Sequence, residues 1–574
     1  MKMMLTEAKP RRLTRRLTGT SPYAGRTASR PRLAAGNGEI GRVACTPLRA
    51  GDGSRSGAWL LRGGIDTIRT YLVGRASRLA LSPFIALALI SAGLRAATPE
   101  LPTPEALLQR HIEAIGGAAA LRQAQSVVFK GEVGLPFLKA QAPIDFLFQA
   151  PDRFFCQFRY HHAFFGFLKV PFFAKREAEA GYDGTNGWTV DFDRDVEAME
   201  PTDQAFFRGL LDKFSPLCFG RNFHLARTLD TERFAGHDCY RVLIVFPFGE
   251  HAFEYYDVKS GLLAGTIYPF DTGDVLANVQ TTYSDFRPVG QGLKLPFRID
   301  LQVADQHYSI KALEVSTDTP NVRVPASKFK SAPPPVSLLK PATMPAREVI
   351  ERHVKASGGD EALRKHTSLH LSGQFQSPGA NGFTNTIEVF LAPPNRFALT
   401  LPTPKSLYRE GCDGDHYWRA DGTNISFAAG KDLAQKLLER EFLADLHAPE
   451  GFRSMDTLGT LKVDGHECYE LLLVRQNGEV FDEFYDVETG FLRERRTDDE
   501  RSGGALKLLA TFEDYRRFGD WMLPAHESHR VAGDPQKVSV TKVEWDTTPD
   551  SVFDMPAEVS KEVRHARAIE PGVR

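Results

Sequence analysis

The sequence has few cysteines, no apolar run as long as the roughly 20 residues that span a bilayer, and no excess of charge of either sign. Only six of its 574 residues are cysteines and no two form a CxxC pair, which argues against a disulfide-rich scaffold or a zinc ribbon. Lys and Arg number 71 against 72 Asp and Glu, so the net charge of −1 gives no electrostatic reason to bind nucleic acid. We expect the cysteines to be small buried residues in strands; they are Cys45, Cys156, Cys218, Cys239, Cys412 and Cys468.

One apolar run stands out near the N-terminal end. It extends from Leu79 to Leu94, follows Arg75 and Arg78, and is followed by small residues, which is typical of a secretory signal peptide. The run is shorter than the roughly 20 residues that span a bilayer. We therefore expect residues 72–97 to be a cleaved signal peptide that directs the chain to the periplasm, and residues 1–71 to be disordered or an over-extended gene start. The alternative is an uncleaved anchor at residues 79–94.

The remainder of the chain repeats itself. RHIEAIGGAAALR from Arg110 matches RHVKASGGDEALR from Arg352, and five further blocks follow in the same order, among them AGHDCY with DGHECY and EYYDVKSGLL with EFYDVETGFL. We place the first repeat at residues 103–326 and the second at 345–557. A Pro-rich linker at 327–344 joins them, and a tail follows from 558 to 574.

The first repeat is longer than the second at one place. Phe154 and Asp183 are 29 positions apart, whereas the matching Phe397 and Asp413 are 16 apart. The 13 additional residues fall on the stretch HHAFFGFLKVPFF. This stretch is therefore an insertion and not part of the shared core.

Each repeat begins with a helical pattern and continues as strands. In EALLQRHIEAIGG the apolar residues recur at helical spacing and Gly116–Gly117 indicates a helix end, with a second short helix after it. SVVFKGEVGL, PIDFLFQA and RFFCQFRY then read as the first three strands, bounded by turn residues such as Asp183–Gly184. A helical period returns at PTDQAFFRGLLDKFSPLCF and at KDLAQKLLEREFLADLH. We therefore predict an α+β fold in which a curved antiparallel sheet carries helices on its open side.

The order of these motifs resembles the LolA/LolB-like superfamily of periplasmic lipoprotein carriers and receptors, the outer membrane lipoprotein-sorting proteins. The resemblance rests on the helix that ends in IGG or SGG, the PDRF or PNRF strand start, the DGxxxW hairpin, GHxCY, and YDVxxGLL or YDVxxGFL before the motif DFRxxxGxxLP. It implies two tandem unclosed antiparallel β-barrels, each covered by helices, with a hydrophobic cavity that takes acyl chains. In the receptor branch a loop between the third and fourth strands touches the membrane.

The insertion of the first repeat occupies the position of that loop. An exposed apolar loop of this size marks a membrane or partner contact, because fully burying one Phe is worth roughly 1.5 to 3 kcal/mol. Nearby Lys169, Lys175 and Arg176 would meet anionic head groups. Two alternatives remain open, a lid over the cavity and a contact between the repeats. The candidate contact residues are Phe164, Phe165, Phe167, Leu168, Val170, Phe172 and Phe173.

The sequence holds no GxSxG, P-loop, HExxH or dinucleotide-binding glycine motif, and we expect no catalytic residue, cofactor or metal. His111 and His353, at matched helix positions, are interpreted as packed or capping residues. His237 and His466 each precede a cysteine by two positions and are interpreted as hairpin residues. The pair His161–His162 has no further ligands at metal-binding spacing.

Three functions are consistent with these features. We favour an exported periplasmic protein, not an enzyme, that binds lipid or lipoprotein acyl chains in a barrel cavity and takes part in envelope lipid or lipoprotein transport, with peripheral membrane contact through the loop. The alternative is an envelope scaffold or protein-interaction module whose cavities are filled by its own side chains. A hydrolase on the same fold is the third.

Overall fold

The structure is a computed structural model. It describes residues 100–559 apart from 136–139, 163–173, 185–186, 191–195, 212–214, 219–222, 272–275, 291, 304–305, 318–337, 379–381, 499–503, 505, 531–534 and 558. The expected signal peptide, the segment before it, most of the linker and the tail lie outside these residues.

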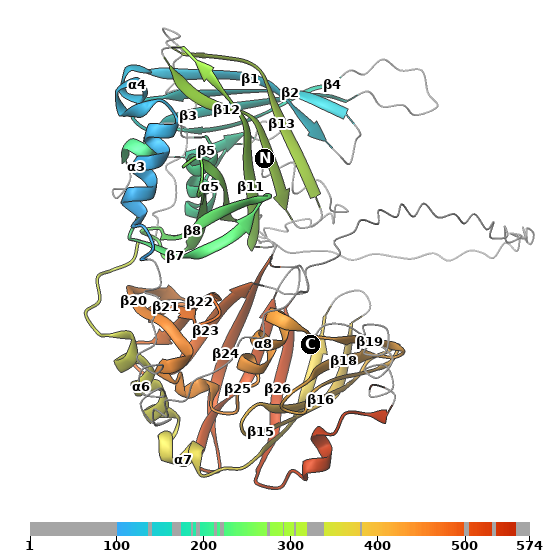
Figure 1. Ribbon diagram of the computed structural model, residues 1–574. Helices are drawn as coiled ribbons and strands as arrows, with labels where there is room; N and C mark the ends of the chain where they lie inside the picture. The colour runs from blue at the N-terminus through green and yellow to red at the C-terminus, as the bar shows by residue number, and fades with distance from the viewer. Residues whose placement is uncertain are drawn as a thin grey trace, which may run out of the picture. The chain divides into compact units, whose positions relative to one another are not determined.

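The first repeat folds as one antiparallel sheet of thirteen strands in the order β6-β5-β4-β3-β2-β1-β13-β12-β11-β10-β9-β8-β7 (Figure 1). Its strands are β1 (Ser126–Leu135), β2 (Ala140–Gln149), β3 (Arg153–His162), β4 (Ala174–Tyr182), β5 (Gly187–Val190), β6 (Val196–Ala198), β7 (Leu225–Phe234), β8 (His237–Val245), β9 (His251–Asp257), β10 (Leu263–Asp271), β11 (Leu276–Val289), β12 (Leu293–Val303) and β13 (Gln306–Thr317).

The second repeat has the same topology, in the order β19-β18-β17-β16-β15-β14-β26-β25-β24-β23-β22-β21-β20. Its strands are β14 (Leu369–Ser377), β15 (Phe383–Ala392), β16 (Arg396–Pro402), β17 (Leu407–Cys412), β18 (Tyr417–Asp421), β19 (Asn424–Phe427), β20 (Phe452–Val463), β21 (His466–Arg475), β22 (Val480–Asp486), β23 (Leu492–Asp498), β24 (Lys507–Phe518), β25 (Trp521–Arg530) and β26 (Gln536–Trp545). The internal duplication of the sequence is therefore a duplication of the fold.

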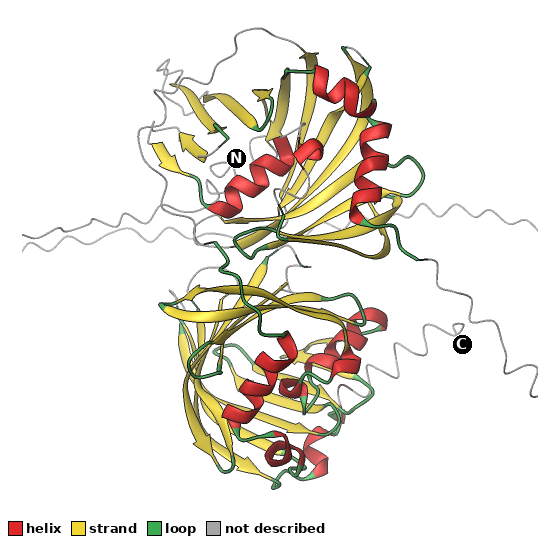
Figure 2. Ribbon diagram, turned by 90° about the vertical axis from the view of Figure 1, so that its left-hand side faces the viewer, coloured by secondary structure: helices red, strands yellow, loops and turns green. Residues whose placement is uncertain are grey.

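Neither sheet closes. In the first repeat β6 and β7 are the two edges, and the chain that connects them contains a helix, α5 (Pro201–Leu211); in the second, α8 (Gly430–Glu439) connects the edges β19 and β20. Figure 2 shows each sheet curving around its own helices. The predicted fold of two tandem unclosed barrels, each covered by helices, is confirmed.

The remaining helices among the described residues lie at the start of each repeat, in the connections and, for one 3-10 turn, after the last strand. They are α3 (Pro104–Ala114), α4 (Gly117–Gln123), α6 (Ala346–Ser357), α7 (Asp360–Arg364) and the 3-10 turns η1 (Ser215–Cys218), η3 (Ala444–Leu446), η4 (Pro449–Gly451) and η6 (Asp550–Phe553). Two observations explain why a glycine follows α3. Gly116 has a φ of 116°, and the Cβ of any other residue there would lie 2.3 Å from the backbone oxygen of Gly292. Gly358 after α6 meets the backbone oxygen of Asp520 in the same way.

The core of the first repeat lies between its helices and the inner face of its sheet. Strand β2 shows how the alternating pattern builds it, since Ile144, Phe146 and Phe148 fall on one face and are at most 4% exposed. Phe129 and Phe154 on the neighbouring strands join the same cluster. Helix α5 adds Phe206 and Phe207 to this cluster. The aromatic side chains described on β1 to β3 and on α5 thus help to fill the barrel of the first repeat.

Candidate ligand cavity

A cavity of about 80 Å³ lies inside the first repeat, between α3 and the inner face of β9 to β12. Its wall is largely apolar and includes Leu108, Ile115, Phe223, Leu263, Phe286 and Leu295. Polar side chains also line it, namely His111, Glu254, Tyr256, Tyr268, Tyr283 and Lys294. An apolar pocket with a few convergent polar groups is the usual form of a ligand site.

The central polar residue of this cavity is Glu254 on β9. Its carboxyl accepts hydrogen bonds from the hydroxyls of Tyr256 (2.6 Å) and Tyr268 (2.9 Å), and Glu254 itself is 8% exposed. Burial raises the pKa of Glu254, and the two tyrosine bonds, which favour the ionised form, offset this only in part. The uncharged form of the Glu254 carboxyl therefore persists to higher pH than is usual for glutamate.

His111 of α3 contributes to the cavity wall and not to a catalytic arrangement. Its Nδ1 accepts the backbone N–H of Leu263 at 3.0 Å, and its ring lies 6.0 Å from that of Tyr256 in an edge-on arrangement. The matching His353 of α6 is also buried, with its ring 5.3 Å from that of Tyr485. Both histidines are packed residues, as the sequence predicted.

The second repeat has a glutamate at the matching position, in a different environment. Glu483 on β22 is fully buried, and its carboxyl accepts hydrogen bonds from the Tyr485 hydroxyl (2.6 Å) and from Nε of Arg495 (2.7 Å). It also lies 2.9 Å from Nε2 of His447. Burial by itself raises the pKa of Glu483, but the charges of His447 and Arg495 outweigh it and hold this pKa far below its ordinary value.

Strand pairing explains why the two glutamates differ. On the neighbouring strand Thr266 stands directly opposite Glu254, and Arg495 stands directly opposite Glu483. Directly opposite residues in an antiparallel pair share a face of the sheet, so the second repeat places a guanidinium where the first has a small hydroxyl. At the same offset of 229 residues that relates the two glutamates, His447 is matched by Cys218.

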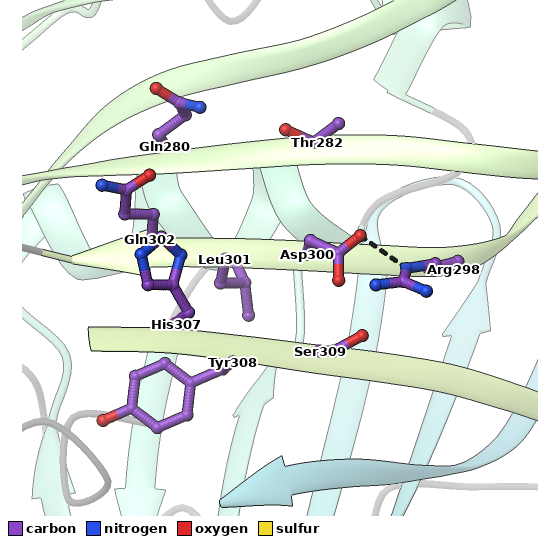
Figure 3. Close-up of a pocket in the computed structure, with 9 residues that line it drawn as sticks. All are labelled: Gln280, Thr282, Arg298, Asp300, Leu301, Gln302, His307, Tyr308 and Ser309. Carbon is purple, nitrogen blue, oxygen red and sulfur yellow. Dashed lines mark hydrogen bonds and ion pairs between the residues drawn. The ribbon is translucent and has the colours of Figure 1, made fainter. Parts of the chain in front are cut away.

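A second hollow, of about 360 Å³, lies over the other face of β11, β12 and β13 (Figure 3). Its polar residues occupy alternate positions on the three strands, whereas Leu301 and Tyr308, which also border it, belong to the buried core. Within it Nε of Arg298 donates to Asp300 at 2.7 Å, the contact drawn in Figure 3. Alternation of this kind is typical of a solvent-facing sheet surface, and we do not interpret this hollow as a ligand site.

The candidate loop residues Phe164, Phe165, Phe167, Leu168, Val170, Phe172 and Phe173 lie outside the described residues. Strand β3 ends at His162 and β4 begins at Ala174, so the insertion connects the third and fourth strands, as predicted. The side chains of His161 and His162 also lie outside the described part of the chain.

The cysteine and histidine of each GHxCY motif belong to a hairpin, as predicted. His237 pairs with Phe234 across the β7–β8 turn, and its Nδ1 lies 3.0 Å from the carboxylate of Asp257. Two positions on, Cys239 is fully buried, and burial raises the pKa of its thiol to about 11. A thiol that remains protonated is a poor nucleophile and a poor metal ligand, which argues against chemistry at this motif.

All four cysteines whose burial is described, Cys156, Cys239, Cys412 and Cys468, are free, buried and located in strands. Within the described ranges no group of three or more His, Cys, Asp or Glu side chains is arranged to hold a metal ion. No helix among these residues is long and apolar enough to cross a membrane.

No protein-family model and no curated protein matches the sequence. Solved structures that are similar include a DUF1329 family protein from Desulfovibrio piger, with 11% identity over 37% of this chain and 98% of that one and a TM-score of 0.28. A LolA superfamily protein from Nitrosomonas europaea has 10% identity over 37% of this chain and 99% of that one, also with a TM-score of 0.28. The MucA/MucB complex from Pseudomonas aeruginosa is matched over 77% of this chain and 99% of that one, at 10% identity and a TM-score of 0.13. At these values the likenesses carry no argument about what this chain binds.

The sequence reasoning missed the two residues that distinguish the repeats most clearly, Glu254 and Glu483. Both belong to the matched motif EYYD or EFYD. Because the residue is a glutamate in both repeats, the motif does not show that the environments of the two side chains differ. The signal that could have found it lies in the following strand, where LAGTI in the first repeat is matched by LRERR in the second. An arginine that enters a buried strand next to a glutamate indicates an internal ion pair.

Proposed function

We propose that this chain is an exported envelope protein that binds an acyl chain of a lipid or lipoprotein in the cavity of its first barrel. The observation that carries the proposal is the apolar cavity of the first repeat, where the buried Glu254 is hydrogen-bonded to two tyrosines and no arginine belongs to the described lining. The matching place in the second repeat holds an internal pair between Glu483 and Arg495. The resemblance of the sequence motifs to lipoprotein carriers supports the same function.

The size of the cavity sets a condition on this proposal. About 80 Å³ is small beside the roughly 300 to 1,000 Å³ of sites that enclose a drug-sized ligand. A complete acyl chain therefore requires side chains of the lining to move. Leu108 of α3, Ile115 directly after α3, and Pro216 of η1 come from segments that lie over the sheet, and we expect the cavity to widen there.

The test is native mass spectrometry with lipid extraction on the chain that begins near Ala97, purified from the periplasm of the cells that make it. The expected result is a co-purifying acyl-chain lipid that is lost when the cavity is filled by mutation. A chain that carries no lipid, and takes up none when lipid is added, contradicts the proposal.

That contrary result would favour the second candidate, an envelope scaffold or protein-interaction module. The observation in its favour is the second repeat, where the side chains of Tyr485, Arg495 and His447 all contact Glu483 in the interior. If the first cavity also closes on itself in solution, both barrels would serve as rigid frames for surfaces that bind partners. The Phe-rich loop would then be part of such a surface.

In the favoured function the loop of the first repeat provides the membrane contact. Its residues follow β3 on the chain, at the position where the receptor branch of the resembled family has its membrane loop. Transfer of cargo to or from a membrane requires the barrel to approach the bilayer. An aromatic loop with lysines at its flank supplies both apolar insertion and attraction to anionic lipids.

A further inference from the structure

The polar residues of the first cavity point to a particular chemical form of the ligand. Glu254 is the carboxylic acid in the lining, and the hydroxyls of Tyr256 and Tyr268 both donate to it. A third hydroxyl, that of Tyr283, donates to the backbone oxygen of Gly209 at 3.4 Å. The buried part of the cavity thus presents hydroxyl groups around one carboxyl.

Three further polar residues lie near this cluster. The nitrogen Nδ1 of His111 already accepts the backbone N–H of Leu263, so this side of the ring does not face a ligand. Lys294 of β12 lines the cavity too, but it is exposed to solvent. Thr266, which stands opposite Glu254, brings no charge. Among the described lining residues, no lysine or arginine side chain is buried next to this carboxyl.

Two ligand forms would behave differently in this environment. An ester or amide carbonyl is an uncharged acceptor that a hydroxyl of the cluster can satisfy with one hydrogen bond. A free fatty-acid carboxylate would bring a second acidic group next to Glu254 in a place of low dielectric. Two carboxyl groups that share a site cannot both ionise easily, so binding would require an additional proton.

We propose that the first cavity recognises an uncharged acyl group, an ester or an amide, through the cluster of Glu254, Tyr256 and Tyr268, and discriminates against the free fatty-acid anion. This inference rests on the proposed function and makes it more specific. In the bound state one tyrosine hydroxyl of the cluster donates to the ligand carbonyl, and the other continues to donate to the Glu254 carboxyl. Lys294 remains available for an anionic group that stays at the solvent-exposed end of the cavity.

The matching place in the second repeat would not show this selectivity. Arg495 and His447 already contact the carboxyl of Glu483 together with Tyr485. The charges of these cations also offset that of Glu483, so a second carboxylate would not meet an uncompensated negative charge there. This makes the second repeat an internal control within the same chain.

The experiment compares decanamide with decanoate, two soluble probes with the same chain, as ligands of the delipidated mature chain at pH 8. We expect decanamide to bind at least about tenfold more tightly, the size of effect that one unpaired or repelled buried polar group produces. In Glu254→Gln the two affinities should come within about threefold of each other, because decanoate gains. Glu483→Gln should leave the ratio of the wild-type chain unchanged.

The outcomes separate this inference from the proposed function. Equal binding of both probes by the wild-type chain, or an unchanged ratio in Glu254→Gln, overturns the inference and leaves acyl-chain binding intact. Failure of both probes and of extracted lipids to bind overturns both. Should Glu254→Gln not fold, Tyr268→Phe provides the second variant, because it keeps the ring and removes one hydroxyl. It should weaken decanamide binding and leave thermal unfolding close to that of the wild-type chain.

Discussion

Glu254 and Glu483 occupy the same position in the two repeats and have opposite electrostatic environments. Burial dominates at Glu254, whose hydrogen-bond donors are two tyrosine hydroxyls, and its pKa rises. Cations dominate at Glu483, and its pKa falls. A duplicated barrel can thus keep the same buried carboxyl and become either a cavity in which tyrosine hydroxyls bind that carboxyl or a core held by an internal ion pair. Two matched positions distinguish them: Thr266 or Arg495 on the facing strand, and Cys218 or His447 in the connection before the following strands.

The turn chemistry of the two repeats has not diverged in this way. Asp257 accepts the backbone N–H of Ser260 and contacts His237, and Asp486 accepts that of Thr489 and contacts His466. These contacts fix the hairpins that give each sheet its register. The difference between the repeats is concentrated in the barrel interior and in the loop after β3, the two places where we propose that ligand and membrane are met.

Breaking the ion pair of the second repeat should give the largest effect. Arg495→Thr copies the first repeat and removes the guanidinium from a fully buried carboxylate, so the free energy of unfolding of the second barrel should fall by about 3 to 5 kcal/mol. Denaturant unfolding measures it. The matched control is Arg298→Thr in the exposed pair with Asp300, which should cost at most about 1 kcal/mol.

A second substitution sharpens the interpretation of that loss. Adding Glu483→Gln to Arg495→Thr removes the unpaired charge and should restore part of the stability. If Arg495→Thr alone costs less than about 1 kcal/mol, the buried pair is not what holds the second barrel and the contrast between the repeats loses its energetic basis.

The reverse change tests the cavity of the first repeat. Thr266→Arg copies the second repeat and places a guanidinium opposite Glu254, where Thr266 is 2% exposed. We expect the lipid seen by native mass spectrometry to be lost, at a cost to stability of about 1 to 3 kcal/mol from overpacking. Thr266→Val, of nearly the same shape, should retain the lipid. A Thr266→Arg chain that folds and still carries lipid would show that the ligand lies elsewhere.

Much of the fold could be predicted from the sequence because the signals that specify it are local. The stretch SVVFKGEVGL, whose residues alternate between two faces, forms β1 (Ser126–Leu135). The first helix ends just before Gly116 and Gly117, as predicted. The repeated order of motifs predicted two sheets of the same topology, and that topology is observed. Turn residues and alternation are properties of neighbouring positions, so one sequence suffices to read them.

The candidate site could not be predicted in the same way. The environment of Glu254 is formed by Tyr268 and Thr266 on the next strand. That of Glu483 includes His447, which comes from a connection before β20. Such contacts depend on register and on packing across the barrel, which periodicity does not specify. The sequence reasoning instead selected the Phe-rich insertion, because an apolar run is visible without knowledge of register.

The insertion supplies the next comparison between the repeats. Phe165→Asp together with Phe167→Asp should lower binding to anionic liposomes by at least about tenfold, since each Phe buried in a bilayer contributes roughly 1.5 to 3 kcal/mol. Co-sedimentation measures the loss. Leu313→Asp, at an apolar side chain of the same repeat that is 61% exposed, is the control and should bind as the wild-type chain does. Unchanged binding of the double variant would favour a lid or an interface between repeats.

The smallest expected effect is a difference in pH dependence, measured as the stability of the wild-type chain minus that of a Gln variant at each pH. The pKa of Glu254 is raised, so the folded state keeps a proton that the unfolded chain releases above the ordinary pKa of 4.5. The stability of the wild type relative to that of Glu254→Gln should therefore decrease as the pH rises from 4.5. For Glu483 the pKa is lowered, so the difference between wild type and Glu483→Gln should hold above pH 4.5 and shrink as pH falls below it. Each slope is limited to one proton, about 1.4 kcal/mol per pH unit. Slopes of the same sign for both variants would mean that the two buried carboxyls share one environment, and the division of roles between the repeats would then be wrong.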